Sequence, residues 1–137
     1  MNLVKLADLP SFGDNRGGFV VLESNQSVPF EIKRLYYIFN TSDNESRGFH
    51  AHINLKQIAI CVKGSCRFIL DDGFGREEVI LDSPTQGLMI GNLTWREMHD
   101  FSEDCVLLIL ASSHYDEEDY IRNYDEFLKV VRSDIRK

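Results

Sequence analysis

Short apolar segments separated by turn residues recur over the first 112 residues, and no stretch of helical periodicity interrupts them. Segments of this length that are rich in β-branched and aromatic residues are typical of strands. Many short strands in succession, without helices between them, predict an all-β sandwich or barrel. The strand segments are 18–23, 32–39, 57–62, 66–70, 78–81, 87–90 and 105–111.

The dipeptide Lys63-Gly64 lies between two of these segments and predicts a two-residue hairpin turn. Such a turn places Cys61 opposite Cys66, a geometry in which a disulfide is possible. The third cysteine, Cys105, makes the number odd, and the spacing of the three is not that of a metal site. We therefore expect three reduced, buried thiols that pack in the core of a cytoplasmic protein.

The pattern changes after residue 115, where a run of acidic residues is followed by apolar residues at helical spacing. Acidic side chains are favourable at a helix N-terminus. We expect one amphipathic C-terminal helix that packs on the sheet or on a partner subunit. Its apolar face consists of Tyr120, Tyr124, Phe127, Leu128 and Val131.

Composition limits the classes of function. A hydrophobic fraction of 43% supports a packed core, and no linker divides residues 1–137, so we expect a single domain. The net charge of -7 is spread along the chain without a basic block, which argues against a nucleic-acid partner. The chain begins without a signal-peptide pattern and contains no apolar run of membrane-spanning length, so we expect a cytoplasmic protein with no membrane partner.

Two histidines, His50 and His52, are two residues apart, so on a strand both side chains project from one face. Such a pair suits acid-base chemistry, because imidazole titrates near neutral pH. A third histidine, His99, converges on the pair if both strands line one barrel. Metal-binding jelly rolls usually carry a carboxylate shortly after such a pair, where this chain has Lys56 and Gln57. Metal-free chemistry is therefore favoured, and a metal site stays an alternative.

Several strings, in unbroken order over nearly the whole chain, resemble the sugar 3,4-ketoisomerases that act on dTDP-4-keto-6-deoxyglucose. The strings are 47–52 (RGFHAH), 64–67 (GSCR), 70–73 (LDDG), 95–101 (WREMHDF) and 115–124 (YDEEDYIRNY). The segment 14–19 (DNRGGF) also looks like a first-strand motif of the related dTDP-sugar 3,5-epimerases.

The resemblance implies a cupin-type jelly roll, or double-stranded β-helix, that uses no metal and no cofactor. It implies a homodimer with swapped N-terminal strands, and a role in making 3-amino-3,6-dideoxy sugars for surface polysaccharides. The residues that match the family's catalytic groups are His50 and His52, with Tyr37 as a helper. The residues expected to bind the substrate are Arg16, Arg34, Arg47, Gln57, Arg96 and His99.

In the expected reaction, His50 moves the carbon-bound proton and His52, helped by Tyr37, moves a proton between the two oxygens. Arg34 and Arg47 are the candidates for the diphosphate. The resemblance leaves the configuration at C4 of the product open, because Arg16 matches the galacto-type enzymes and Arg96 matches the gluco-type enzymes.

Three other functions remain open from the sequence. The first is 3,5-epimerisation of the same substrate, although that family has a single histidine at this place. The second is a metal-dependent cupin oxygenase that uses His50, His52 and His99. The third is a sugar-nucleotide-binding module without catalysis, which the histidine pair argues against.

Overall fold

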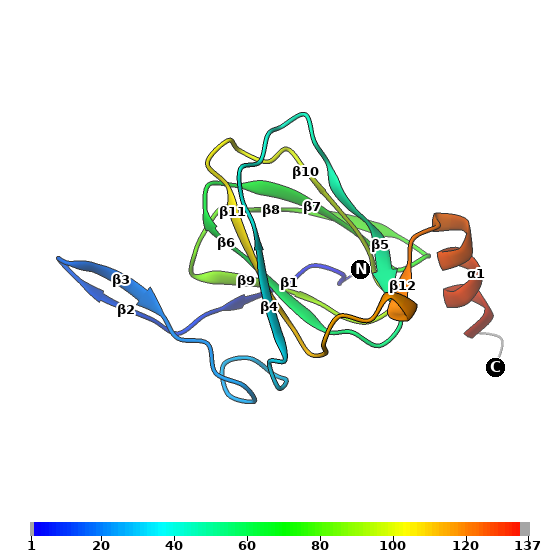
Figure 1. The fold of residues 1–137 in the computed structure, drawn as a ribbon, viewed down its shortest axis with the longest axis horizontal. Helices are drawn as coiled ribbons and strands as arrows, with labels where there is room; N and C mark the ends of the chain where they lie inside the picture. Colours follow the sequence, from blue (N-terminus) through cyan, green and yellow to red (C-terminus); the bar gives the residue numbers. More distant parts are fainter. Residues whose placement is uncertain (1, 135–137) are drawn as a thin grey trace.

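Two antiparallel sheets of five strands face each other in the computed structural model, which describes residues 2–134 (Figure 1). The first sheet has the order β1-β9-β6-β11-β4 and the second the order β12-β5-β10-β7-β8. The first sheet consists of β1 (Lys5–Asp8), β4 (Arg34–Ile38), β6 (Gln57–Lys63), β9 (Gln86–Ile90) and β11 (Val106–Ala111). The second consists of β5 (Arg47–His52), β7 (Cys66–Asp71), β8 (Arg76–Leu81), β10 (Trp95–His99) and β12 (Tyr120–Ile121). This architecture confirms the predicted all-β jelly roll.

The main core lies between the two sheets, and a second core covers the outer face of the first sheet. Strand β6 shows why both are needed, because its first five residues are buried. Ala59 and Cys61 belong to the core between the sheets. Ile58 and Ile60 point outward and pack against Val28 and its neighbours in the segment before β4. A strand buried on both faces reads as a continuous apolar run, as this one does in the sequence.

The predicted hairpin at Lys63-Gly64 is wrong. Strand β6 ends at Lys63 in the first sheet, and β7 begins at Cys66 in the second, so Gly64 and Ser65 cross between the sheets. Gly64 has a φ of 73°, a conformation that glycine adopts without strain. A turn signal in the sequence fixes the local backbone but not which strand becomes the hydrogen-bonded partner.

The C-terminal helix, α1 (Tyr124–Asp134), begins later than the sequence pattern predicts. The acidic residues before it form a short 3-10 helix (Glu117–Asp119), and Tyr120 then pairs with β5 instead of lying on the helix. The Asn123 side chain accepts a hydrogen bond from the Glu126 backbone at 2.9 Å, which caps the helix. Helix α1 packs on the outer face of the second sheet through Phe127 and Val131.

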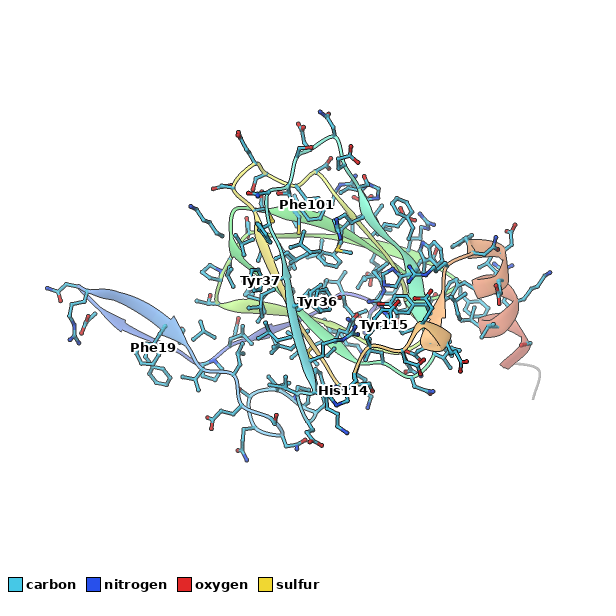
Figure 2. All side chains as sticks on the ribbon, viewed as in Figure 1. Phe19, Tyr36, Tyr37, Phe101, His114 and Tyr115 are labelled. Carbon is cyan, nitrogen blue, oxygen red and sulfur yellow. The ribbon has the colours of Figure 1, made fainter. Side chains whose placement is uncertain are left out.

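An N-terminal hairpin of β2 (Ser11–Asp14) and β3 (Gly17–Val20) extends away from the two sheets (Figure 1). It forms a separate two-stranded sheet. The rings of Phe12 and Phe19 lie 5.6 Å apart on the hairpin and are 55% and 62% exposed. Figure 2 shows Phe19 on this hairpin. Helix α1, the one α-helix within residues 2–134, falls short of the length and apolarity that a membrane crossing requires.

Candidate active site

The two histidines of β5 point into the molecule from one face of the strand, as their spacing predicts. Their ring centroids lie 4.9 Å apart at an interplanar angle of 88°. His52 is 1% exposed, and His50 is partly buried. Two imidazoles at this separation can act on the same small molecule.

A β-bulge sets the direction of His50. His50 pairs with Arg96 and Gly48 pairs with Glu97, so Phe49 between them has no partner in the ladder with β10. Gly48 and Phe49 have φ angles of 92° and 58°. A Cβ atom on residue 48 would lie 3.0 Å from the Arg96 carbonyl oxygen, so glycine is required for this approach.

Behind the histidines lies a buried arginine, Arg96, which is 2% exposed. Within the described residues its guanidinium bonds only to neutral oxygens: the Gln57 side-chain oxygen and the Thr94 carbonyl, the latter at 3.1 and 3.3 Å. Gln57 also donates to the Tyr36 hydroxyl at 3.1 Å. Burial lowers the pKa of Arg96 to about 10, so the side chain stays cationic at neutral pH.

Burial and this cation keep both histidines neutral. Burial, followed by the positive charge of Arg96, lowers the pKa of His50 to about 4. The same two causes lower the pKa of His52 further. A neutral imidazole has a lone pair that can accept a proton, so each ring can serve as a base.

Two residues missed by the sequence analysis complete the surroundings of His52. The Asp119 carboxylate lies 3.2 Å from His52 Nδ1, an arrangement that places the proton on Nδ1 and leaves Nε2 as the acceptor. The Tyr120 ring lies 4.3 Å from the His52 ring and 5.0 Å from the His50 ring. Tyr120 pairs with His52 between β12 and β5, and this pairing brings the Tyr120 ring against both histidine rings.

An open cavity of about 590 Å³ lies in front of His50. Its wall contains Arg34, Tyr36, Arg47, Tyr120 and Arg122. A smaller cavity of about 180 Å³ contains His52 and Asp119, and Arg34 and Tyr120 line both cavities. Three buried nitrogens have no hydrogen-bond partner within residues 2–134, and they are Arg34 Nε, His50 Nδ1 and His52 Nε2. Buried polar atoms of this kind point to a ligand that satisfies them.

The structure does not bring Tyr37 to the histidines. Side chains alternate along β4, so Tyr36 faces the cavity, whereas Tyr37 is 58% exposed on the opposite face beside Phe39 (Figure 2). The expectation that Tyr37 assists His52 is corrected accordingly, because Tyr36 is the tyrosine of β4 that lines the site.

His99 also lies apart from the pair. Arg96 and Met98 of β10 face inward, so His99 projects from the other face, where it bonds to Glu97 at 3.0 Å and to Ser46 at 2.8 Å. The expected convergence of three histidines is therefore wrong, and the set proposed for a metal-dependent oxygenase does not form. Arg16 lies on the projecting hairpin with its side chain 86% exposed and paired to Asp14, away from the cavity of its own chain.

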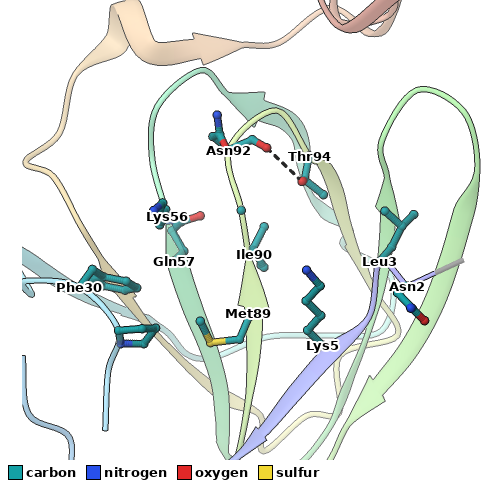
Figure 3. A pocket seen from close by; sticks show the side chains of 12 residues that line it. Asn2, Leu3, Lys5, Phe30, Lys56, Gln57, Met89, Ile90, Asn92 and Thr94 are labelled. Carbon is teal, nitrogen blue, oxygen red and sulfur yellow. Dashed lines mark hydrogen bonds between the residues drawn. The ribbon is translucent and has the colours of Figure 1, made fainter. Parts of the chain in front are cut away.

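A further cavity of about 470 Å³ opens where β1 and β6 begin and β9 ends (Figure 3). Lys5, Lys56 and Met89 contribute to its wall, and Gln57 separates it from the histidine cavity. It contains neither His50 nor His52. The cavity with the acid-base groups is therefore the candidate active site.

The arrangement suits removal of a proton from a carbon next to a carbonyl. A neutral imidazole can take the proton, and a fixed cation can stabilise the negative charge that then develops on oxygen. The arginines around the opening can hold an anionic group of the same molecule.

Comparison with known proteins agrees with this chemistry. The family described as "FdtA: WxcM-like, C-terminal" matches residues 2–132. The TDP-4-oxo-6-deoxy-alpha-D-glucose-3,4-oxoisomerase of Aneurinibacillus thermoaerophilus is 54% identical over 127 residues, which cover 93% of this chain and 91% of that protein.

Solved structures of similar proteins share the fold over almost the full length. The WlaRB TDP-quinovose 3,4-ketoisomerase of Campylobacter jejuni is 52% identical, with a TM-score of 0.90 and coverage of 94% of this chain and 99% of that one. A variant of the 3,4-ketoisomerase QdtA from Thermoanaerobacterium thermosaccharolyticum, in complex with TDP-4-keto-6-deoxyglucose, is 41% identical, with a TM-score of 0.94 and coverage of 97% and 96%.

The lowered histidine pKa values predict a pH-dependent stability. Because the folded state keeps His50 and His52 neutral, protons bind the unfolded state more readily below its histidine pKa of about 6.5. The free energy of unfolding should therefore fall as the pH drops from about 6.5 to about 4, with each of the two residues contributing up to about 3 kcal/mol. Thermal unfolding at a series of pH values measures this loss.

The double variant His50→Asn/His52→Asn should show a flatter profile over the same pH range. His114→Asn is the matched control, because His114 is exposed and the profile should stay as in the wild type. Equal slopes for the double variant and the wild type would contradict the assignment.

Proposed function

The chain belongs to the FdtA family of WxcM-like, C-terminal domains and is a TDP-sugar 3,4-ketoisomerase, and we propose that its substrate is TDP-4-keto-6-deoxyglucose and its base is His50. The reaction moves a carbonyl from C4 to C3 of the sugar. It requires removal of the proton on C3, an enediolate intermediate and delivery of a proton to C4.

The observation that carries the choice of base is the opening of His50 into the larger cavity. This cavity, of about 590 Å³, contains His50 but not His52. His52 lies in the smaller cavity, with its Nδ1 bonded to Asp119. A hexose ring fits in front of His50, so His50 takes the C3 proton and returns it to C4.

Arg96 supplies the positive charge that the intermediate needs. Negative charge develops on the two sugar oxygens when the C3 proton leaves, and a preorganised cation in a buried site stabilises it strongly. Arg96 pairs with His50 across the β5–β10 ladder, so its side chain projects from the same face. Because Gln57 and Thr94 are neutral partners, the positive charge of Arg96 is not neutralised, and it acts on the substrate from behind the cavity wall.

His52 and Tyr36 are proposed to move the second proton. The reaction removes a proton from the oxygen on C3 and adds one to the oxygen on C4. The acceptor atom His52 Nε2 has no partner within the described residues. Tyr36 receives a hydrogen bond from Gln57, and burial raises its pKa, so its own hydroxyl proton is retained for donation. Tyr36 takes the helper role that the sequence analysis assigned to Tyr37.

The diphosphate is proposed to bind at the arginines of the cavity rim. Arg34 carries a buried, unpartnered Nε, and Arg47 and Arg122 line the same cavity. Guanidinium groups bind phosphate oxygens through paired hydrogen bonds. A single nucleotide is thereby held although the chain has a net charge of -7.

A homodimer with swapped N-terminal hairpins is proposed from two exposed apolar surfaces. One is the β2–β3 hairpin with Phe12 and Phe19, and the other is the outer face of the edge strand β4, where Leu35 and Tyr37 are 53% and 58% exposed. An isolated hairpin is marginally stable in water, and an edge strand has backbone groups available for pairing. A hairpin docked on β4 would also bring Arg16 toward the cavity of the other protomer.

The cytoplasm is the proposed location. Cys61, Cys66 and Cys105 are all free thiols in the fold. Unpaired cysteines are usual in a reducing compartment.

His50→Asn should lower turnover by about two to four orders of magnitude, because positioned acid-base catalysis contributes that much. The assay is incubation with TDP-4-keto-6-deoxyglucose in deuterated water, with C3, C4 and C5 followed by NMR. The affinity for TDP should change little, since His50 contacts the sugar. His99→Asn is the control and should keep its turnover, because His99 lies on the other face of the sheet.

Near wild-type conversion by His50→Asn would refute its role as the base. The wild type should exchange no proton at C5. Exchange at both C3 and C5 would instead indicate epimerisation.

A pair of neighbouring tyrosines tests the helper role. Tyr36→Phe should lower kcat by roughly ten-fold or more, because the variant lacks the hydroxyl that moves the second proton. Tyr37→Phe should leave kcat unchanged. Steady-state kinetics of both variants decides between them, and a loss confined to Tyr37→Phe would overturn the proposed assignment.

The dimer is tested with the double variant Phe12→Ser/Phe19→Ser, which should sediment as a monomer where the wild type sediments as a dimer. The control is Phe74→Ser/Ile80→Ser, which removes two equally exposed apolar side chains elsewhere. Analytical ultracentrifugation measures the mass. A monomeric wild type at micromolar concentration would contradict the proposal.

A further inference from the structure

All three cysteines of the chain meet in the core at one end of the sheets. Cys61 lies on β6, Cys66 begins β7, and Cys105 directly precedes β11. Each is at most 1% exposed. Their sulfur atoms lie within 4.8 Å of one another, and the Sγ atoms of Cys61 and Cys105 are 3.6 Å apart. Apolar packing explains why each thiol is buried, but it does not require the three to converge.

The sulfur separations match those of a metal-thiolate site. A zinc–sulfur bond is about 2.3 Å long, so two sulfurs on one ion lie about 3.8 Å apart in tetrahedral geometry and about 4.0 Å apart in trigonal geometry. The Cys61–Cys105 separation of 3.6 Å is close to these distances, and no pair in the cluster is more than 4.8 Å apart.

We propose that Cys61, Cys66 and Cys105 form a binding site for one soft divalent cation of the Zn²⁺ class. Thiolates select soft ions over Mg²⁺ and Ca²⁺. The cation would tie together β6 in the first sheet, β7 in the second and the turn before β11. This role is structural and independent of the histidine site.

Charge favours a divalent over a monovalent ion. Three thiolates with a monovalent cation such as Cu⁺ leave two net negative charges, and a divalent cation leaves one. The negative charges of Asp82 and Asp104 already act on Cys61 and Cys105, respectively. Buried negative charge beside these carboxylates is costly, so the complex with the smaller net charge is preferred.

The end of the sheets gives a short route to the cluster. The turn at Gly64-Ser65 lies against the turn that begins at Ser102, joined by hydrogen bonds of 2.9 Å in both directions between Ser65 and Ser102. Lys63 and Asp104 beside these turns are exposed. An ion therefore reaches the thiols by opening one pair of turns, without unfolding either sheet.

The test titrates the fully reduced chain with Cd²⁺ alone, because cadmium bound to thiolates has an ultraviolet charge-transfer band. We expect one equivalent per chain, a rise in the unfolding temperature and displacement by excess Zn²⁺. Binding of Cd²⁺ to imidazole gives no thiolate band, so the histidine site does not interfere. The outcome is also independent of ketoisomerase activity, so the two proposals can fail separately.

Cys66→Ala should weaken binding by at least about a hundred-fold, more than the loss of an outer hydrogen bond to a metal ligand. Leu107→Val is the matched control, since it removes volume from the same core but no sulfur, and its titration should resemble that of the wild type. A wild type without the band overturns the proposal whether or not the cysteine variant folds. Unchanged binding by Cys66→Ala, or one ion shared by two chains, overturns it as well.

Discussion

The buried Arg96 cation is the interaction on which the rest of the site depends. Burying a cation raises the free energy of the folded state unless its N–H groups form hydrogen bonds. Here the neutral oxygens of Gln57 and Thr94 accept these hydrogen bonds. A carboxylate at position 57 would neutralise the charge and remove one of the two main causes of the lowered histidine pKa values. The glutamine that the sequence analysis read as the absence of a metal ligand therefore has a second role, because it leaves the positive charge available to the reaction.

Local periodicity predicted those parts of the site that depend on one strand. The spacing of His50 and His52 placed them correctly on one face, since strand side chains alternate. The same rule does not state which face is inward. Tyr37 and His99 were assigned to the site, but β4 presents Tyr36 there instead, and of the two predicted residues of β10 only Arg96 faces inward. The sequence of one strand does not reveal that choice, because it depends on how the whole sheet packs.

Contacts between distant segments account for the remaining misses. Asp119 and Tyr120 lie in an acidic stretch with the composition of a helix start, and only their pairing with β5 shows that they belong to the histidines. The convergence of the three cysteines also depends on contacts that the sequence does not show. Lys63-Gly64 resembles a hairpin turn, yet the chain crosses to the other sheet there, and Cys105 arrives from a segment about 40 residues away. The strands that were predicted correctly, by contrast, carry their signal within a few residues.

The positive charges around the two histidines matter for the proposed reaction. A base with a pKa of about 4 is weak for removing a proton from carbon, and the positive charges of Arg96 and Arg122 contribute to this low value. Arg122 lines the cavity proposed to hold the diphosphate, so a bound nucleotide would offset its charge on His50. The pKa of His50 would then rise and make it a stronger base when substrate is present. The pKa of His52 is lowered further, and Arg34 and Arg122 are among the causes, so a bound nucleotide would raise the pKa of both histidines together.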